Sequence, residues 1–102
     1  VVIVDYNKIQ ALQRLKDVLP LDDLSLKFKA FNWQCIKVKD GHSFQSLIKS
    51  FKTKNKKGKP LAFIVNTIKG KGIKEFENDP VWHARKLKGA EIEIGKKKLG
   101  IL

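Results

Sequence analysis

The sequence is poor in cysteine, in acidic residues and in long apolar runs. Cys35 is the single cysteine among 102 residues, so neither an internal disulfide nor a cysteine-based metal cluster can form. Its apolar neighbours predict a buried, unreactive thiol, and the composition fits a soluble protein of a reducing, cytoplasmic compartment. The longest apolar runs, Val1–Val4 and Leu61–Val65, fall well short of the ~20 residues that a membrane-spanning helix needs. No basic stretch precedes Val1, so no signal peptide is predicted.

Basic residues outnumber acidic ones by 22 to 10, which gives a formal net charge of +12. Such a surplus raises the possibility of nucleic-acid or polyphosphate binding. However, Arg14 and Arg85 are the only arginines, and arginine is the side chain that reads guanine edges in a bidentate manner. We therefore expect most of the lysines to form a solvated surface, with some available to small anions such as phosphates. Much of the excess lies in three lysine clusters: Lys52, Lys54, Lys56, Lys57 and Lys59; Lys69, Lys71 and Lys74; and Lys96, Lys97 and Lys98.

Three short apolar segments are predicted to be strands: Val1–Val4, Gln34–Val38 and Leu61–Val65. The first and third are continuously apolar, which is typical of strands that are buried on both faces in a parallel sheet. Between the strands, apolar residues recur at helical spacing. One predicted helix spans 21–31, with Asp22 and Asp23 in its first turn. A second begins at Ser43, is capped by Ser43 or Asp40, and fades in the lysine-rich run ending at Gly58. Its apolar stripe is formed by Phe44, Leu47, Ile48 and Phe51.

The element order is strand, loop, helix, strand, helix, strand. It predicts an α/β fold with an open, mainly parallel sheet and flanking helices. In such sheets ligands bind beyond the carboxyl ends of the strands, so functional residues are expected after Val4, Val38 and Val65. Residues 73–88 are predicted to form a long ordered loop, and 91–102 to form a terminal helix that Gly95 and Gly100 weaken.

Three polar residues near these loops could carry chemistry. The amide oxygen of Asn7 is a suitable ligand for Mg²⁺ or Ca²⁺, although asparagine also commonly makes a simple turn. His83 could bind a phosphate or move a proton, or it could be a packed or solvent-facing histidine. His42 is expected to pack or cap at a helix start. No Walker loop, zinc-ligand spacing or Gly-x-Ser-x-Gly motif occurs.

Taken together, five segments resemble motifs of the transketolase family. Val4–Gln10 is similar to the second half of its thiamine-diphosphate fingerprint, and Phe31–Trp33 and Asp40–His42 are similar to segments around its next strand. Thr67–Gly72 and Glu77–His83 resemble its later loops. The resemblance covers residues 1 to about 100, and it is strongest to the short type with separate N-terminal and C-terminal subunits.

The resemblance implies a site as well as a fold. The side-chain oxygen of Asn7 and the backbone carbonyl of Ile9 would bind Mg²⁺ (or Ca²⁺), which holds the diphosphate of thiamine diphosphate. Ile68 would pack near the thiazolium ring. His83 would lie near the diphosphate and the donor sugar and would handle a substrate hydroxyl. The implied partners are sugar-phosphate substrates and a pyrimidine-binding domain or C-terminal subunit in a homo- or hetero-oligomer.

The sequence departs from the family pattern in three places. The Gly-Asp-Gly half of the fingerprint is absent, so residues 1–102 are expected to be the later part of a thiamine-diphosphate-binding domain that is inactive alone. Ala84 stands where the family usually has glycine, and Gly95 with the adjacent lysines departs from the usual terminal helix. The alternatives are a related enzyme, such as deoxyxylulose-phosphate synthase or dihydroxyacetone synthase, and a basic binding module without enzymatic activity.

Overall fold

The computed structural model describes residues 1–11, 13–56 and 58–101, which form two compact units. The first unit comprises Val1–Asn7 and Pro20–Thr67, and the second comprises Lys8–Leu19 and Ile68–Leu102. No helix in the described ranges is long and apolar enough to cross a membrane.

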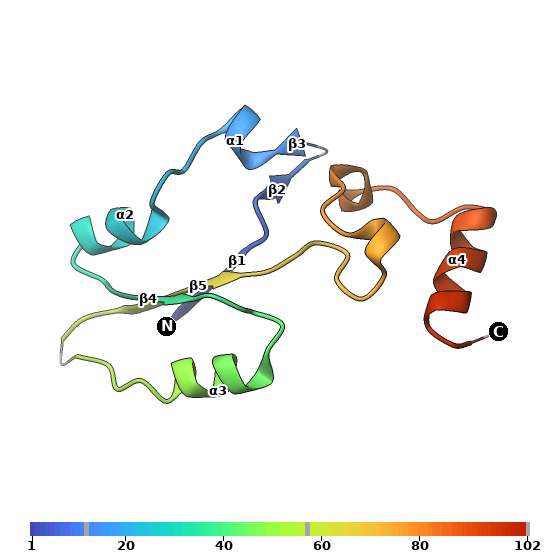
Figure 1. Cartoon of the computed structure of the whole chain (residues 1–102). Helices are drawn as coiled ribbons and strands as arrows, with labels where there is room; N and C mark the ends of the chain where they lie inside the picture. The colour runs from blue at the N-terminus through green and yellow to red at the C-terminus, as the bar shows by residue number, and fades with distance from the viewer. Residues whose placement is uncertain (12, 57, 102) are drawn as a thin grey trace. The chain divides into compact units, whose positions relative to one another are not determined.

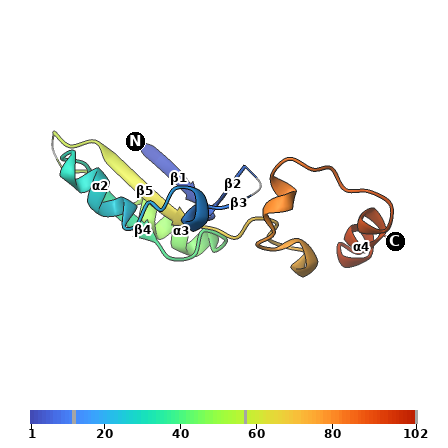
Figure 2. The same cartoon turned by 90° about the horizontal axis from the view of Figure 1, so that it is seen from above.

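The first unit is built on a three-stranded parallel sheet in the order β1-β5-β4 (Figures 1 and 2). Its strands are β1 (Val2–Tyr6), β4 (Gln34–Val38) and β5 (Leu61–Asn66). Both neighbours pair with β5 in parallel register, so β5 is the central strand. The prediction of an open parallel α/β sheet is therefore confirmed.

Two helices cover the opposite faces of this sheet (Figure 1). Helix α2 (Leu24–Ala30) lies on one face and α3 (Phe44–Phe51) on the other. On the α3 face, Leu47 packs against the core cluster and the Phe51 ring meets Phe63 edge-on at 4.9 Å between centroids. The core cluster is formed by four buried residues, Val38, Leu61, Phe63 and Val65.

The caps explain where the two helices begin. The Asp23 carboxylate accepts a hydrogen bond from the Ser25 N–H at 3.0 Å, and the Ser43 hydroxyl accepts one from the Ser46 N–H at 3.2 Å. These bonds satisfy N–H groups that the first helical turn leaves without partners. Ser43 was a predicted cap, whereas Asp23 precedes its helix instead of lying in the first turn.

Burial on both faces was predicted for two strands and holds for one. The apolar residues of β5, Leu61 to Val65, are all buried. The prediction is wrong for β1, where Ile3 is 59% exposed, because the helices of this unit pack mainly against β4 and β5. The strand also extends to Tyr6, two residues beyond the predicted end, since Asp5 and Tyr6 continue the pairing with β5.

The second unit consists of short elements. It contains a hairpin of β2 (Ile9–Gln10) and β3 (Gln13–Arg14), helix α1 (Leu15–Val18) and two 3₁₀ turns, η1 (Lys74–Phe76) and η2 (Pro80–His83). It ends with α4 (Ala90–Lys98), which contains Gly95; Leu102, the last residue of the predicted terminal helix, lies outside the described residues. The hairpin and α1 were not predicted, and the predicted long loop holds both 3₁₀ turns.

Phe76 is the buried centre of this unit. Its ring packs against Trp82, with centroids 4.7 Å apart. Gly95 of α4 is buried against η1, where a Cβ would lie 3.8 Å from Phe76 and Ile73, an ordinary contact distance. Lys98 and Glu75 add an ion pair of 2.9 Å between the same two elements.

Candidate functional site

The carboxyl ends of the three parallel strands meet at one edge of the first unit. In register, Tyr6 of β1 lies opposite Asn66 of β5, and Val38 of β4 lies opposite Val65. Asn7, which directly follows β1, is half-buried at this edge. The segments after β4 and β5 begin beside it in the sheet order, as the topology predicts.

A hydrogen bond joins the ends of β1 and β5. The Thr67 hydroxyl donates to the carboxylate of Asp5, and the Thr67 N–H donates to the Tyr6 carbonyl at 3.5 Å. Thr67 is the last residue of the first unit and directly precedes Ile68. The contact therefore fixes the point at which the chain leaves β5.

Gly41 allows the loop after β4 to press against the end of β5. Its N–H donates to the Asn66 carbonyl at 2.8 Å. A Cβ at this position would lie 2.5 Å from Val65 Cγ1 and 2.7 Å from Thr67 Cγ2, distances that real Cβ atoms do not adopt. The backbone of this loop can approach β5 only because position 41 has no side chain.

His42, in the same loop, does not cap helix α3, because the cap is Ser43. His42 is exposed, and its N–H donates to the Asp40 carboxylate at 2.9 Å. It therefore takes part in an Asp turn through its backbone, and the prediction that it caps the helix is wrong.

The second unit packs the hairpin that contains Ile9 against the turn that ends at His83. Ile9 is buried in β2, and the hairpin of β2 and β3 packs against η2, whose last residue is His83. Arg14 of β3 donates to the Asn78 carbonyl at 3.2 Å, just before η2 begins. His83 itself is exposed, and Ile68 is half-buried at the start of the loop that leads to η1.

That loop closes on itself through its backbone. The Asn78 N–H donates to the Lys69 carbonyl at 2.9 Å, and Gly70 has a φ of 77°. A Cβ at Gly70 would overlap the carbonyl of Phe76. The glycine of this motif is therefore required both by backbone conformation and by space.

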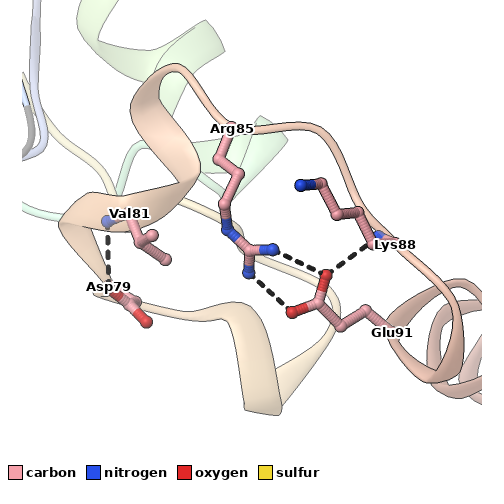
Figure 3. A network of polar contacts seen from close by, with 5 residues as sticks. All are labelled: Asp79, Val81, Arg85, Lys88 and Glu91. Atoms are coloured by element: carbon pink, nitrogen blue, oxygen red, sulfur yellow. Dashed lines mark hydrogen bonds and ion pairs between the residues drawn. The ribbon is translucent and has the colours of Figure 1, made fainter.

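The segment around His83 is fixed by contacts on both sides (Figure 3). Asp79 caps η2 by accepting from the Val81 N–H at 3.0 Å. Two residues after His83, the Arg85 guanidinium lies 4.4 Å from the centre of the Trp82 ring and donates to both carboxylate oxygens of Glu91, at 2.6 and 3.0 Å. The Lys88 N–H also donates to Glu91, at 2.9 Å.

These contacts shift the acid–base behaviour of the pair. The side-chain hydrogen bonds from Arg85, with help from the Lys88 N–H, hold the pKa of Glu91 below its usual value. The same bonds raise the pKa of Arg85. Both groups therefore stay charged at neutral pH.

Ala84 fits its position without backbone strain, and Cys35 is less buried than predicted. Ala84 has a φ of −133°, outside the left-handed region, so its methyl group causes no backbone strain next to His83. Cys35 is half-buried instead of fully buried. Burial still raises the pKa of its thiol, which keeps it protonated and of low reactivity, as predicted.

The contacts of Asp5, Gly41, Thr67, Arg85 and Glu91 were missed as individual features. The first three fall inside motifs noted in the sequence, but nothing local indicated that they touch one another. Arg85 could have been noticed as one of only two arginines beside 20 lysines. Arginine is selected where a planar, bidentate donor is needed.

Comparison with known proteins agrees with this architecture. The transketolase thiamine diphosphate binding domain matches residues 1–102. An apulose-4-phosphate transketolase subunit of Actinobacillus succinogenes is 34% identical over 99 residues, covering 97% of this chain and 36% of that protein. A 6-deoxy-6-sulfo-D-fructose transketolase subunit of a Clostridium species is 36% identical over 84 residues, covering 81% of the chain and 30% of that protein.

Full-length transketolases match as well. Human transketolase is 34% identical over 87 residues, which is 85% of this chain and 14% of that enzyme. The chain thus spans about a third of the length of the subunit relatives and a smaller part of the human enzyme. Because the family's thiamine diphosphate binding domain matches residues 1–102, the whole of this chain, the chain belongs to the transketolase family.

Proposed function

We propose that this chain is part of a transketolase that transfers a two-carbon ketol unit between sugar phosphates, using thiamine diphosphate and Mg²⁺. The observation that carries the proposal is the half-buried Asn7 directly after β1, at the carboxyl edge of a parallel sheet in a chain that matches the cofactor-binding domain throughout. Relatives with this domain are named as transketolases of sugar-derived substrates, including apulose 4-phosphate and 6-deoxy-6-sulfo-D-fructose.

We also propose that residues 1–102 are the later half of that domain. The Gly-Asp-Gly half of the fingerprint would lie upstream and supply a second side-chain ligand to the metal. A pyrimidine-binding domain would come from the same protein or from a partner subunit. Two relatives are named as subunits, which supports the second arrangement.

The donor chemistry of the chain suits Mg²⁺. Asn7 offers an amide oxygen and Ile9 a backbone carbonyl, both hard ligands of the kind Mg²⁺ prefers. Lys8, between them, has a φ of 63°, a left-handed conformation that few residues other than glycine adopt and that often occurs at functional sites. Diphosphate oxygens, water and the upstream half would complete the coordination.

The other two residues act on the organic part of the site. Thiamine diphosphate, when bound, supplies the carbanion chemistry. Ile68 would provide an apolar contact for the cofactor ring. His83, exposed at the end of η2, would hydrogen-bond a substrate oxygen and hold or accept its proton.

The test is the affinity of the complete protein for Mg²⁺ and thiamine diphosphate, measured by titration calorimetry. Asn7→Ala should weaken binding by at least about 10-fold, since even loss of an outer-shell partner costs ~10–100-fold in metal affinity. Asn32→Gly is the matched control: Asn32 has a φ of 65° in an exposed turn, and glycine keeps that backbone.

Equal affinities for wild type and Asn7→Ala would refute the metal assignment. The isolated 102-residue chain serves as a second comparison in the same experiment. It should bind the cofactor weakly or not at all, because it offers a single side-chain metal ligand and no pyrimidine pocket. Tight, Mg²⁺-dependent binding to the isolated chain would contradict the proposal that half of the domain lies upstream.

A further inference from the structure

We propose that Arg85 and Glu91 act as positioning residues for His83, by fixing the 3₁₀ turn η2 to the start of helix α4. The expected effect on turnover rests on the proposed function. The positioning itself concerns only contacts within the second unit. It assigns a role to two residues outside every motif that the sequence analysis identified.

Trp82, which directly precedes His83, is held in place by its ring contacts. One comes from Phe76 and another from the Arg85 guanidinium, 4.4 Å from the indole centre. The indole Nε1 is buried, and within the described part of the chain it has no hydrogen-bond partner. An unsatisfied buried donor opposes burial of the ring, so the place of Trp82 depends on these ring contacts.

Arg85 is itself anchored from the next helix. Its guanidinium uses both arms on Glu91, and Glu91 lies in the first turn of α4 (Figure 3). The Lys88 N–H holds the same carboxylate from the chain that joins η2 to α4. The guanidinium can therefore lie over Trp82 only while Glu91 holds it there.

The choice of arginine at this position also supports a positioning role. The chain has 20 lysines and two arginines, and both arginines hold the segment that carries His83. Arg14 donates to the carbonyl of Asn78, which lies just before η2. Arg85 lies over the ring of Trp82, which lies within η2. Only a planar, delocalised cation can stack on an indole and form a bidentate pair at the same time, so lysine is not equivalent here.

The consequence is that the position of the His83 backbone depends on a contact two residues further along the chain. If Arg85 loses its hold, Trp82 loses one of its ring partners and η2 can shift. Small displacements of a reacting group can cost about 100-fold in rate. The pair would thus affect turnover without touching the substrate.

The first test uses proton NMR of the complete protein, in which the imidazole signals of His83 and His42 are assigned by their loss in His83→Ala and His42→Ala. In Arg85→Lys and in Glu91→Gln, the imidazole resonances of His83 should move toward random-coil positions. Those of His42, in the first unit, should stay unchanged and serve as the internal reference. Glu93→Gln is the matched control, since it removes an exposed ion pair with Lys96 from the same helix.

The second test is donor-ketose kinetics of the complete protein. Arg85→Lys and Glu91→Gln should each lower kcat/KM by about 10–100-fold at temperatures well below the melting transition. The double variant should be no worse than the poorer single one, because residues that act as a unit are not additive. A merely structural ion pair would lower the melting temperature and leave both the His83 resonances and kcat/KM unchanged.

The two readouts separate the possible failures. Unchanged His83 resonances in both variants overturn the positioning proposal, even if the protein is a transketolase. Shifted resonances in a protein that lacks ketol transfer support the positioning and reject the proposed function. Should Arg85→Lys fail to fold by circular dichroism, the milder Glu91→Gln decides.

Discussion

Replacing Gly41 by alanine should destabilise the first unit without changing its chemistry. The new Cβ would meet Val65 Cγ1 at 2.5 Å, Thr67 Cγ2 at 2.7 Å and the Asn66 carbonyl oxygen at 2.8 Å. Two of these atoms belong to side chains that pack in or beside the central strand, and the third is backbone, so none can move away cheaply. Since φ of Gly41 lies outside the left-handed region, the cost is one of space alone.

The magnitude follows from overpacking. Inserting a methyl group into a filled site typically costs about 1–3 kcal/mol. The hydrogen bond from the Gly41 N–H to the Asn66 carbonyl would also stretch, and such a bond contributes roughly 1 kcal/mol. With a urea m-value near the low end of the usual range, about 1 kcal/mol/M, a loss of ~2 kcal/mol lowers the unfolding midpoint by ~2 M.

Gly95→Ala is the matched control, because the same chemical change should have the opposite sign there. Gly95 lies inside α4, and a Cβ would find ordinary contacts at 3.8 Å from Ile73 Cδ1 and Phe76 Cε2. Alanine in a helix interior is favoured over glycine by about 0.5–1 kcal/mol. The second unit should therefore gain stability.

Tryptophan fluorescence can follow the two units separately. Trp33 lies in the first unit, where its ring meets Phe28 at 5.3 Å, and Trp82 lies in the second. Urea titrations in a Trp82→Phe background report on Gly41→Ala, and titrations in a Trp33→Phe background report on Gly95→Ala. An unchanged or raised midpoint for Gly41→Ala would show that the loop after β4 does not press against β5 as described.

Three further predictions concern catalysis, acid stability and charge. His83→Ala should lower donor turnover of the complete protein by about 10²–10⁴-fold. The melting temperature should change little, because His83 is exposed. A large drop in melting temperature with normal kcat/KM would instead support a structural role. The pKa of Glu91 is lowered on folding, so its stabilisation is complete above the pKa of the unfolded chain, about 4.3, and is lost as the pH falls through the folded value. Glu91→Gln should therefore flatten the loss of stability below about pH 4.3, and an equally steep loss would contradict this. Any nucleic-acid binding should be independent of sequence and should fade by about 200 mM salt, and selective binding that persists there would favour a basic binding module.

The strands and helices that pack against one another were the predictable part of the fold. In α3, the offsets of Phe44, Leu47, Ile48 and Phe51 predicted the helix, and Ser43 its cap. The same stripe did not predict burial, since Phe44 is 81% exposed and Phe51 45%, although Leu47 packs against the core cluster. Periodicity shows which face of a helix is apolar, but burial depends on what the tertiary structure places against that face.

The end of β1 and the short elements were less predictable for a local reason. Asp5 and Tyr6 interrupt the apolar run, so the pattern ends at Val4, although pairing with β5 carries the strand on to Tyr6. Two-residue strands such as β2 and β3 are too short to show any alternation. They form through their pairing with each other and their packing against η2, which are contacts of the tertiary structure.

The candidate site, like the fold, could be predicted from the sequence only in part. A topological rule sufficed to place Asn7, Gly41 and Thr67 at one edge, because parallel strands bring their carboxyl ends together. Contacts between distant residues, such as Asp5 with Thr67, need the register of the sheet, and no spacing in the sequence encodes it.

The two arginines are an intermediate case between residues that a topological rule places and contacts that no sequence spacing encodes. A chain that uses lysine almost everywhere gains little from arginine at a solvated position, where both side chains are simply charged. The rarity of arginine in this sequence therefore indicates that positions 14 and 85 need the planar geometry of a guanidinium group. In the folded chain, Arg14 donates to a backbone carbonyl. Arg85 forms a bidentate pair with a carboxylate and lies over an indole ring. Both arginines contact residues in or next to the turn that contains His83. Their positions therefore indicate the segment whose placement matters most for the proposed chemistry.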